Sequence, residues 1–227
     1  MIPPSPATAI VTGGGRGIGA AVARALTSRG LCVTVFGRTA SDLEAVVRQG
    51  HAALAVRGDV AREEDVARLL AEHERVLGPA DVLVNNAGIL ERGLVEETPP
   101  ARWRAVVDVN LTGAFLCARA VIPGMKRRGR GRIVNVASIS GTIGGERSSA
   151  YNASKWGLIG FTKCLAEELR SHGVQSLAVS PGSVDTEMLK QTPYGPGMPP
   201  DDVARVIAWC ACEAPDAMTG TNVEVFG

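Results

Sequence analysis

Residues 9–19 read AIVTGGGRGIG, an apolar β-branched run followed by a glycine cluster. The apolar side chains of residues 18–28 then recur at helical spacing, so this order predicts a strand, a tight turn and a helix. Glycines let the backbone of such a turn pass close to a pyrophosphate, and the free N–H groups at the helix start attract anions. The G-x-G-x-x-G string fits only in its alanine variant, from Gly15 to Ala20, so the inference rests more on position than on the string.

Apolar runs and helical stretches alternate to the end of the chain. Strands are expected at residues 9–11, 31–36, 53–56, 81–84, 133–136, 174–179 and 223–226. Helices are expected at residues 18–28, 42–49, 63–77, about 101–125, 150–171 and 202–212, with Val66, Leu69, Leu70 and Val76 inward on the third. Near-continuous apolar strands separated by helices indicate a parallel sheet covered on both faces. The predicted fold is a single α/β domain, residues 1–227, of the Rossmann-type doubly wound class.

Composition and charge exclude several classes of protein. The chain has 227 residues, 45% of them hydrophobic, with a formal net charge of +1. This charge gives no broad field for nucleic acid or anionic lipid. No uncharged run approaches the roughly 18 residues of a membrane span, and the start lacks the features of a signal peptide, so we expect a cytoplasmic protein. The five cysteines show no metal-ligand spacing, and the three histidines lie far from them, so neither a disulfide scaffold nor a metal site is expected.

Two arginines near the glycine turn bear on the choice of cofactor. Folds that bind NAD usually place an acid about 20 residues after the turn to hold the ribose 2′-hydroxyl. Here the first acidic residue of the chain is Asp42, whereas Arg38 follows the second predicted strand and Arg16 stands within the turn. Two guanidiniums suit a 2′-phosphate that a carboxylate would repel. We therefore expect NADP(H) to be favoured over NAD(H), the alternative being that both arginines are merely solvated.

A tyrosine and a lysine, Tyr151 and Lys155, lie one helical turn apart. A free phenol, with a pKa near 10, is a poor proton shuttle at neutral pH. One ammonium at about 4 Å, with an effective dielectric near 20, supplies about 4 kcal/mol, enough to lower the phenol pKa by about three units. By spacing alone the pair is more typical of a helix surface. Ser138 changes this balance because it follows a central strand and shares a sheet edge with the glycine turn.

Short motifs over almost the entire chain resemble those of the short-chain dehydrogenase/reductase family. They are Thr12-Gly13-x-x-x-Gly17-x-Gly19, Asp59-Val60, Asn85-Asn86-Ala87-Gly88, Asn110, Ser138, Tyr151-x-x-x-Lys155 and Pro181-Gly182-x-Val184-x-Thr186. Each motif is short, but their order and spacing together are highly specific. The resemblance implies an NADPH-dependent ketone reductase that also runs in reverse, similar to 3-oxoacyl-acyl-carrier-protein reductases.

The resemblance also assigns roles to individual residues. Tyr151 matches the general acid that protonates the carbonyl oxygen, and Ser138 matches the hydroxyl that polarises and orients the carbonyl. Lys155 matches the residue that binds the nicotinamide ribose and lowers the tyrosine pKa. Asn110 matches a residue that holds a water for proton relay, with helix capping as a compatible role. The implied cofactor contacts are Gly13, Gly15, Arg16, Gly17, Ile18, Gly19, Arg38, Asp59, Val60, Asn86, Ala87, Gly88, Tyr151, Lys155, Pro181, Gly182, Val184 and Thr186.

The substrate stays open. Residues 187–200 are short for the family's substrate lid and contain four prolines, so an open pocket is expected, with residues 141–147 and 188–198 contacting the substrate. One alternative function is a reductase of 3-oxoacyl thioesters of acyl carrier protein or coenzyme A. Another is a non-catalytic cofactor-binding regulatory protein, which the intact Ser138, Tyr151 and Lys155 disfavour. The basic cluster at residues 126–132 fits a solvated helix end better than a patch for an acyl carrier protein.

Assembly is expected from the two longest predicted helices, which the resemblance implies would pair with their copies in a four-helix interface. Their apolar side chains exceed what one sheet needs. These side chains are Leu111, Ala114, Phe115, Ala118, Val121, Leu158, Phe161, Leu165 and Leu169. We expect a homodimer or homotetramer. The family's usual Asp-Gly-Gly ending is absent after Thr219-Gly220, which puts the subunit contact of the last strand in doubt.

Overall fold

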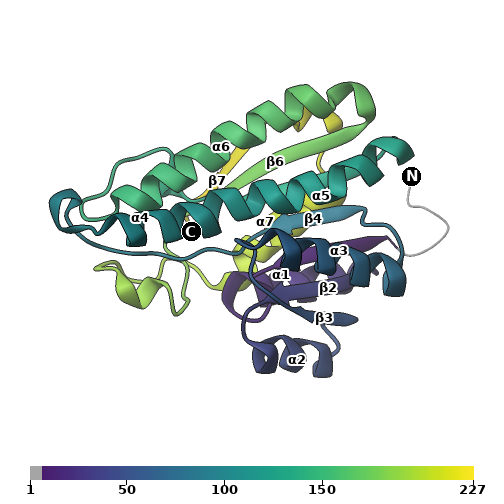
Figure 1. The fold of residues 1–227 in the computed structure, drawn as a ribbon, viewed down its shortest axis with the longest axis horizontal. Coiled ribbons are helices and arrows are strands. Elements are labelled where there is room, and N and C mark those ends of the chain that lie inside the picture. The colour runs from purple at the N-terminus through teal and green to yellow at the C-terminus, as the bar shows by residue number, and fades with distance from the viewer. Residues whose placement is uncertain (1–6) are drawn as a thin grey trace.

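Seven parallel strands form one sheet in the order β3-β2-β1-β4-β5-β6-β7, seen in a computed structural model that describes residues 7–227 (Figure 1). The strands are β1 (Thr8–Thr12), β2 (Cys32–Gly37), β3 (Leu54–Arg57), β4 (Val82–Asn85), β5 (Gly131–Val136), β6 (Val174–Pro181) and β7 (Asn222–Val225). The order reverses between β1 and β4, and such a switch point leaves a crevice outside the carboxyl ends of the strands. The doubly wound fold class is therefore confirmed. Of the predicted domain, residues 1–6 lie outside the described part.

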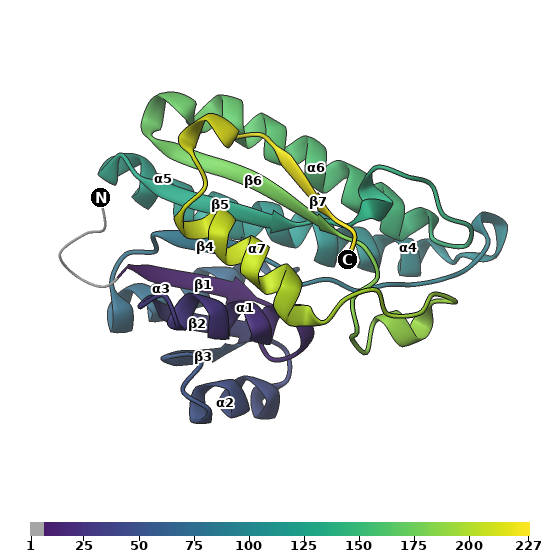
Figure 2. The ribbon, with the colours of Figure 1, turned by 180° about the vertical axis from the view of Figure 1, so that it is seen from behind.

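Helices cover both faces of the sheet (Figure 2). They are α1 (Gly17–Thr27), α2 (Ala40–Arg48), α3 (Glu63–Leu77), α4 (Pro100–Val107), α5 (Gly113–Arg128), α6 (Ser149–Leu169) and α7 (Pro200–Cys212). One apolar core lies between the sheet and α1, α2 and α7, and a second between the sheet and α3, α5 and α6. Every predicted strand and helix is present, with ends that differ by a few residues at most, as helix fraying and strand pairing commonly produce.

The helix predicted at about residues 101–125 is longer than expected and has a defect in its middle. A π-helical turn, Asp108–Thr112, joins α4 to α5, and Asn110 lies within it. The whole stretch Pro100–Arg128 is long and apolar enough to cross a membrane by composition, with a hydropathy of 1.6 over its most apolar part. However, 44% of that part is buried inside the fold, and a single such helix is also typical of a protein core. No membrane span follows from it.

The inward face of α3 departs from the prediction at one position. Val66 and Leu69 are buried as expected, but Val76 is 45% exposed, because it lies in the last turn, beyond the contact with the sheet. His73 is fully buried instead. Its Nδ1 lies 2.8 Å from Thr34 Oγ1 and its Nε2 lies 3.1 Å from Thr8 Oγ1. The imidazole therefore ties α3 to β1 and β2.

Most of the apolar side chains expected at a subunit interface lie in the core of this chain instead. Ala114, Ala118, Val121, Leu158, Leu165 and Leu169 are buried, and Leu111 and Phe161 are partly buried. The prediction was wrong for the six buried residues, because α5 and α6 lie directly on the sheet and these side chains belong to its apolar cores. Of the expected set, Phe115 is exposed, and Trp156 on α6 is exposed as well. The oligomeric state itself stays a prediction.

The basic cluster at residues 126–132 lies at the amino end of β5, at the edge of the sheet opposite the switch-point crevice. The Arg132 guanidinium donates to the backbone oxygen of Cys210 at 2.8 Å, at the end of α7. Arg130 pairs with Asp81 at 3.4 Å, and Arg128 also approaches Asp81. These contacts favour a structural role for three of the five basic residues of the cluster.

Candidate active site

A cleft of about 700 Å³ opens at the carboxyl ends of the strands. Its walls come from the turns after β1 to β6, from the start of α6 and from residues 183–194. Every predicted cofactor contact lines this cleft, as do Ser138, Tyr151 and Lys155. Asn110 does not line it. Among residues 7–227, no group of His, Cys, Asp or Glu side chains is arranged to hold a metal ion.

The turn after β1 has the shape that a pyrophosphate requires. A Cβ on Gly19 would stand 2.1 Å from the backbone oxygen of Gly13, so only glycine fits there. Gly17, at φ +52°, adopts a left-handed conformation that side chains disfavour. Helix α1 then begins with no side-chain cap and no acidic residue in its first turn. Its first N–H groups and positive dipole end therefore remain available to an anion, so these residues fit a dinucleotide phosphate group.

The segment after β4 is fastened to this turn. Thr12 Oγ1 accepts hydrogen bonds from the backbone N–H groups of Asn86 and Ala87, each at 3.0 Å. In return, Asn86 Nδ2 donates to the backbone oxygens of Thr12 at 2.9 Å and of Gly13 at 3.2 Å. The glycine turn and the Asn86 segment thus form one rigid wall at the centre of the cleft.

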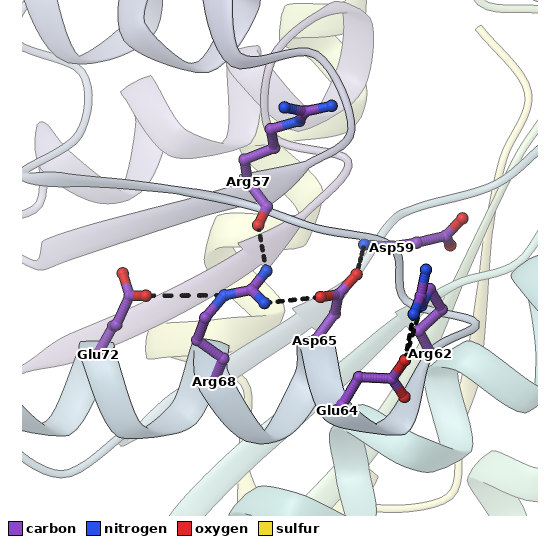
Figure 3. Close-up of polar contacts among 7 residues, drawn as sticks. All are labelled: Arg57, Asp59, Arg62, Glu64, Asp65, Arg68 and Glu72. Atoms are coloured by element: carbon purple, nitrogen blue, oxygen red, sulfur yellow. Dashed lines mark hydrogen bonds and ion pairs between the residues drawn. The ribbon is translucent and has the colours of Figure 1, made fainter.

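A network of charged side chains holds the turn after β3 (Figure 3). Asp65 Oδ2 accepts a hydrogen bond from the backbone N–H of Asp59 at 2.9 Å, and this bond keeps the pKa of the Asp65 carboxyl below its usual value. Arg68 pairs with Asp65 at 2.8 Å and donates to the backbone oxygen of Arg57 at 2.7 Å. The first turns of α3 therefore fix the backbone at Asp59 and Val60, both of which line the cleft.

Two arginines and one acid line the cleft beside the turns that follow β1 and β2. This part is called the nucleotide end, because the predicted phosphate contacts lie there. Arg16 and Arg38 both line it, and Arg57 Nε donates to the backbone oxygen of Arg38 at 3.2 Å. Asp42 lines it as well, from the first turn of α2, and its Cβ would lie 2.9 Å from a Cβ placed on Gly15. Asp42, the first acidic residue of the sequence, thus reaches this region from a helix.

Tyr151 and Lys155 face the cleft from α6, and Ser138 faces it from the end of β5. Lys155 Nζ donates to the backbone oxygen of Val136 at 2.8 Å and lies 5.6 Å from the centre of the Tyr151 ring. Ser138 Oγ accepts a hydrogen bond from the backbone N–H of Ser140 at 3.1 Å and is hydrogen-bonded to Tyr151. This arrangement gathers two hydroxyl groups and one amino group in a single pocket.

Burial dominates the pKa values of this pocket. It raises the pKa of Tyr151, while the hydrogen bond with Ser138 acts in the opposite direction. It lowers the pKa of Lys155 to about 8. In the protein alone, burial thus outweighs the lowering of the tyrosine pKa that was expected from the ammonium, and the effect of Lys155 on Tyr151 stays a prediction. Removal of water favours the neutral form of each group. The free-energy cost of burying the two charged forms exceeds their mutual attraction at this separation.

Asn110 lies behind the wall of the cleft. Its Oδ1 accepts from the backbone N–H of Ile89 at 2.8 Å, and its Nδ2 donates to the backbone oxygen of Ile89 at 3.0 Å and to Ser154 Oγ at 3.0 Å. This side chain therefore clamps the segment after β4 to α6, which carries Tyr151. Its role in holding a water stays a prediction.

The substrate side of the cleft differs from the prediction. Residues 141–147 do not line it, because the wall passes from Ser140 directly to Ser148. Ile89, Leu90, Glu91 and Arg92 take their place. These residues directly follow the Asn86-Ala87-Gly88 motif at the end of β4, and that position was the only signal for them in the sequence. Of the expected residues 188–198, the cleft is lined by Met188, Leu189, Gln191, Thr192 and Tyr194, whereas residues 195–198 do not line it.

Comparisons with known proteins agree with this arrangement. The family model for short chain dehydrogenase matches residues 7–195. The chain is 37% identical to an acetoacetyl-CoA reductase of Shinella zoogloeoides, over 96% of each chain. It is 38% identical to a 3-oxoacyl-[acyl-carrier-protein] reductase of Synechocystis, over 96% of this chain and 95% of that one.

Solved structures show the same similarity. A gluconate 5-dehydrogenase from Burkholderia cenocepacia, crystallised with NADP and tartrate, superposes with a TM-score of 0.90 at 30% sequence identity. The match covers 98% of this chain and 94% of that one. The likeness thus extends over the cleft as well as the sheet.

Proposed function

The chain belongs to the short-chain dehydrogenase family, and from this premise we propose that Ser138, Tyr151 and Lys155 interconvert a ketone and a secondary alcohol in the cleft. The protein is an NAD(P)-dependent oxidoreductase acting on CH–OH and C=O groups. The observation that carries the proposal is the convergence of these three side chains at the end of β5 and the start of α6, beside the glycine turn. A purely regulatory binding protein would not need this convergence.

Each of the three residues has a distinct task in the proposed reaction. Tyr151 delivers its phenolic proton to the carbonyl oxygen during reduction, and its raised pKa keeps that proton in place before the reaction. Ser138 Oγ accepts from Ser140 N–H, so its hydroxyl hydrogen serves as a donor, to Tyr151 in the protein alone and to the same carbonyl oxygen when a substrate is bound. Lys155 uses one N–H on Val136, and its remaining N–H groups face the cleft. A nicotinamide dinucleotide supplies or accepts the hydride when bound.

For the cofactor, we propose that NADP(H) is preferred over NAD(H). Arg16 and Arg38 at the nucleotide end offer two guanidiniums to a 2′-phosphate. The similar gluconate 5-dehydrogenase was crystallised with NADP, which supports the same choice. Asp42 is the residue that acts against it, since a carboxylate repels a phosphate, but one acid is outnumbered by two arginines.

The remaining proposals concern the substrate class, the assembly and the location. We propose a small-molecule ketone or alcohol as substrate, with a 3-oxoacyl thioester as the second candidate because two similar proteins are named as reductases of such thioesters. Proteins of this family are commonly oligomeric, and we propose a homodimer or homotetramer in the cytoplasm. An acyl carrier protein is the less favoured partner, because three of the five basic residues of the cluster have structural contacts.

A panel assay tests the proposed reaction. Oxidation of NADPH and of NADH would be followed with acetoacetyl thioesters, small diketones, sugars, steroids and simple oxo acids. The expected result is turnover of at least one ketone that disappears in a Tyr151→Phe variant with unchanged cofactor affinity. Absence of turnover with every ketone and both cofactors, in protein that binds the cofactor, would refute the proposal.

A further inference from the structure

Three arginines, Arg16, Arg38 and Arg92, line the cleft among residues 7–227. Arg16 and Arg38 belong to the nucleotide end. Arg92 instead follows β4 on the side where Ser138 and Tyr151 face the cleft, together with Ile89 and Leu90. It also lines a neighbouring cavity of about 150 Å³. A positive charge therefore stands on the substrate side of a wall whose other side chains are the aliphatic Ile89 and Leu90 and the acidic Glu91, which pairs with Arg102 at 3.7 Å.

The guanidinium of Arg92 is held in position by the segment that leads into α6. Its Nη1 donates to Ser148 Oγ at 3.2 Å, and its Nη2 approaches the backbone oxygen of Glu146 at 3.4 Å. Ser148 is buried, and its Oγ donates to the same Glu146 oxygen at 3.2 Å. Ser148 directly precedes α6, so Arg92 is fixed relative to Tyr151, three residues further along.

The turn that supplies these acceptors is strained. Arg147 is the non-glycine residue with a positive φ, at +59°, among residues 7–227. A left-handed conformation at such a residue costs free energy and persists only where the surrounding structure imposes it. Here the backbone oxygen of Arg147 accepts a hydrogen bond from the N–H of Gly93 at 2.9 Å. The strained turn thus contacts both the Arg92 side chain and the backbone of the next residue, Gly93.

Arg92 has no carboxylate partner within residues 7–227, whereas its neighbours do. Arg102 pairs with Glu91 at 3.7 Å, and Arg147 pairs with Glu97 at 3.8 Å. A guanidinium carries five N–H donors, and Arg92 uses two of them on neutral oxygens. Arg92 therefore brings a guanidinium with unused N–H donors and no paired carboxylate among residues 7–227 to the border between the catalytic cleft and the neighbouring cavity. Such a fork matches the two oxygens of a carboxylate.

We propose that Arg92 binds a carboxylate of the substrate, so that the preferred substrates are oxo acids and the corresponding hydroxy acids with a free carboxylate. This inference rests on the proposed ketone–alcohol reaction and specifies its substrate class. It separates free acids from the thioester alternative, because a thioester carries no charge at the position of the acid group. Arg92 thereby sets specificity, while Ser138 and Tyr151 act on the carbonyl.

Matched acids and amides test the inference. The probes are 2-oxobutanoate, 3-oxobutanoate, 4-oxopentanoate and 5-oxohexanoate, each compared with its own amide and with an acetoacetyl thioester. In the wild-type protein, kcat/KM for the best acid should exceed that for its amide by at least about tenfold. Arg92→Gln should lower kcat/KM for that acid about ten- to hundredfold and change the value for the amide by less than about threefold.

Arg104→Gln is the matched control, because Arg104 is an exposed arginine on α4 that lines neither cavity. It should leave the preference for the acid intact. Binding gives a second measurement that needs no turnover. With saturating cofactor, a Tyr151→Phe protein should bind the best acid in calorimetry, and adding Arg92→Gln to it should weaken that binding about tenfold or more. Equal melting temperatures of the variants would show that the fold is retained.

The outcomes separate this inference from the proposed function. If no ketone of any kind is turned over, the proposed function fails. If neutral ketones or thioesters are turned over as well as or better than the acids, the proposed function stands and the role of Arg92 is overturned. The same holds if Arg92→Gln lowers kcat/KM for acid and amide equally, because that result indicates a purely structural effect.

Discussion

Stability at mildly acidic pH should depend on one histidine far from the cleft. His73 is fully buried between α3 and the amino ends of β1 and β2. Thr8 Oγ1 donates its hydrogen to the backbone oxygen of Pro79 at 2.7 Å, so it accepts from His73 Nε2–H. Nδ1 is then the acceptor for the Thr34 hydroxyl at 2.8 Å. This neutral form satisfies each partner, whereas a proton on Nδ1 would face the hydrogen of Thr34.

The magnitude follows from the pKa. Burial lowers the pKa of His73 from 6.5 to about 4, with the charge of Asp81 acting in the opposite direction. The unfolded chain therefore takes up the proton first, so this contribution to stability is complete above pH 6.5 and is lost as the pH falls toward 4. A shift of this size corresponds to about 3 kcal/mol in total, of which about 2 kcal/mol disappears between about pH 7.5 and about pH 5.

Urea unfolding at these two pH values measures the loss, at one fixed protein concentration because an oligomer gains stability with concentration. His73→Gln removes the titrating group, and His172→Gln, at an exposed position, is the control for loss of a histidine. The wild-type protein and the control should lose about 2 kcal/mol more than His73→Gln between the two pH values. Equal losses in His73→Gln and in the wild-type protein would refute the reasoning.

Four further predictions concern the cleft and the assembly. Tyr151→Phe should reduce turnover by more than about a hundredfold with cofactor affinity nearly unchanged, whereas Lys155→Ala should lower both, measured by steady-state kinetics and calorimetry. Arg38→Ala should weaken NADP(H) binding about tenfold and leave NAD(H) binding almost unaltered; an equal loss for both cofactors would contradict the phosphate contact. Light scattering at micromolar concentration should give a dimer or tetramer, and Trp156→Glu, at an exposed position on α6, should weaken that assembly. A monomeric wild-type protein would reject the last prediction.

The parallel strands and the doubly wound fold class could be predicted because local patterns indicate them. Each parallel strand is buried on both faces and therefore reads as an apolar run, and each crossover helix shows a helical period. Contacts between segments that are distant in the sequence could not be predicted from local patterns. The inward side chain of α3 is His73 rather than Val76 because Thr8 and Thr34 stand opposite it, and neither can be recognised from the spacing within α3. The apolar faces of α5 and α6 were likewise assigned to a partner although this chain's own sheet covers them.

Some residues of the site could likewise be predicted from the sequence, and others could not. Residues directly after strands could be placed in the cleft from the topology alone, and the glycine turn, Ser138 and the Asn86 segment all followed that rule. Asp42 could not, and for Arg92 the position after β4 indicated the cleft but not the contacts that hold its side chain. Asp42 reaches the nucleotide end from a helix, and Arg92 depends on a left-handed residue fifty-five positions later that turns backbone oxygens toward it. In both cases the contact joins two distant segments, and the sequence of neither segment predicts the other as its partner.

The pKa values of Tyr151 and Lys155 show a different kind of limit. The sequence gives the charges and their helical spacing, and a Coulomb calculation at about 4 Å then lowers the phenol pKa. In the fold, the distance and the surroundings both differ from those of the calculation, because Nζ lies 5.6 Å from the ring centre and both groups are removed from water. Desolvation opposes ionisation of each group separately, while attraction requires both to be ionised at once. In the protein alone Tyr151 therefore keeps its proton at neutral pH, where reduction of a carbonyl needs it, while Lys155, with a pKa of about 8, is still mostly an ammonium at pH 7.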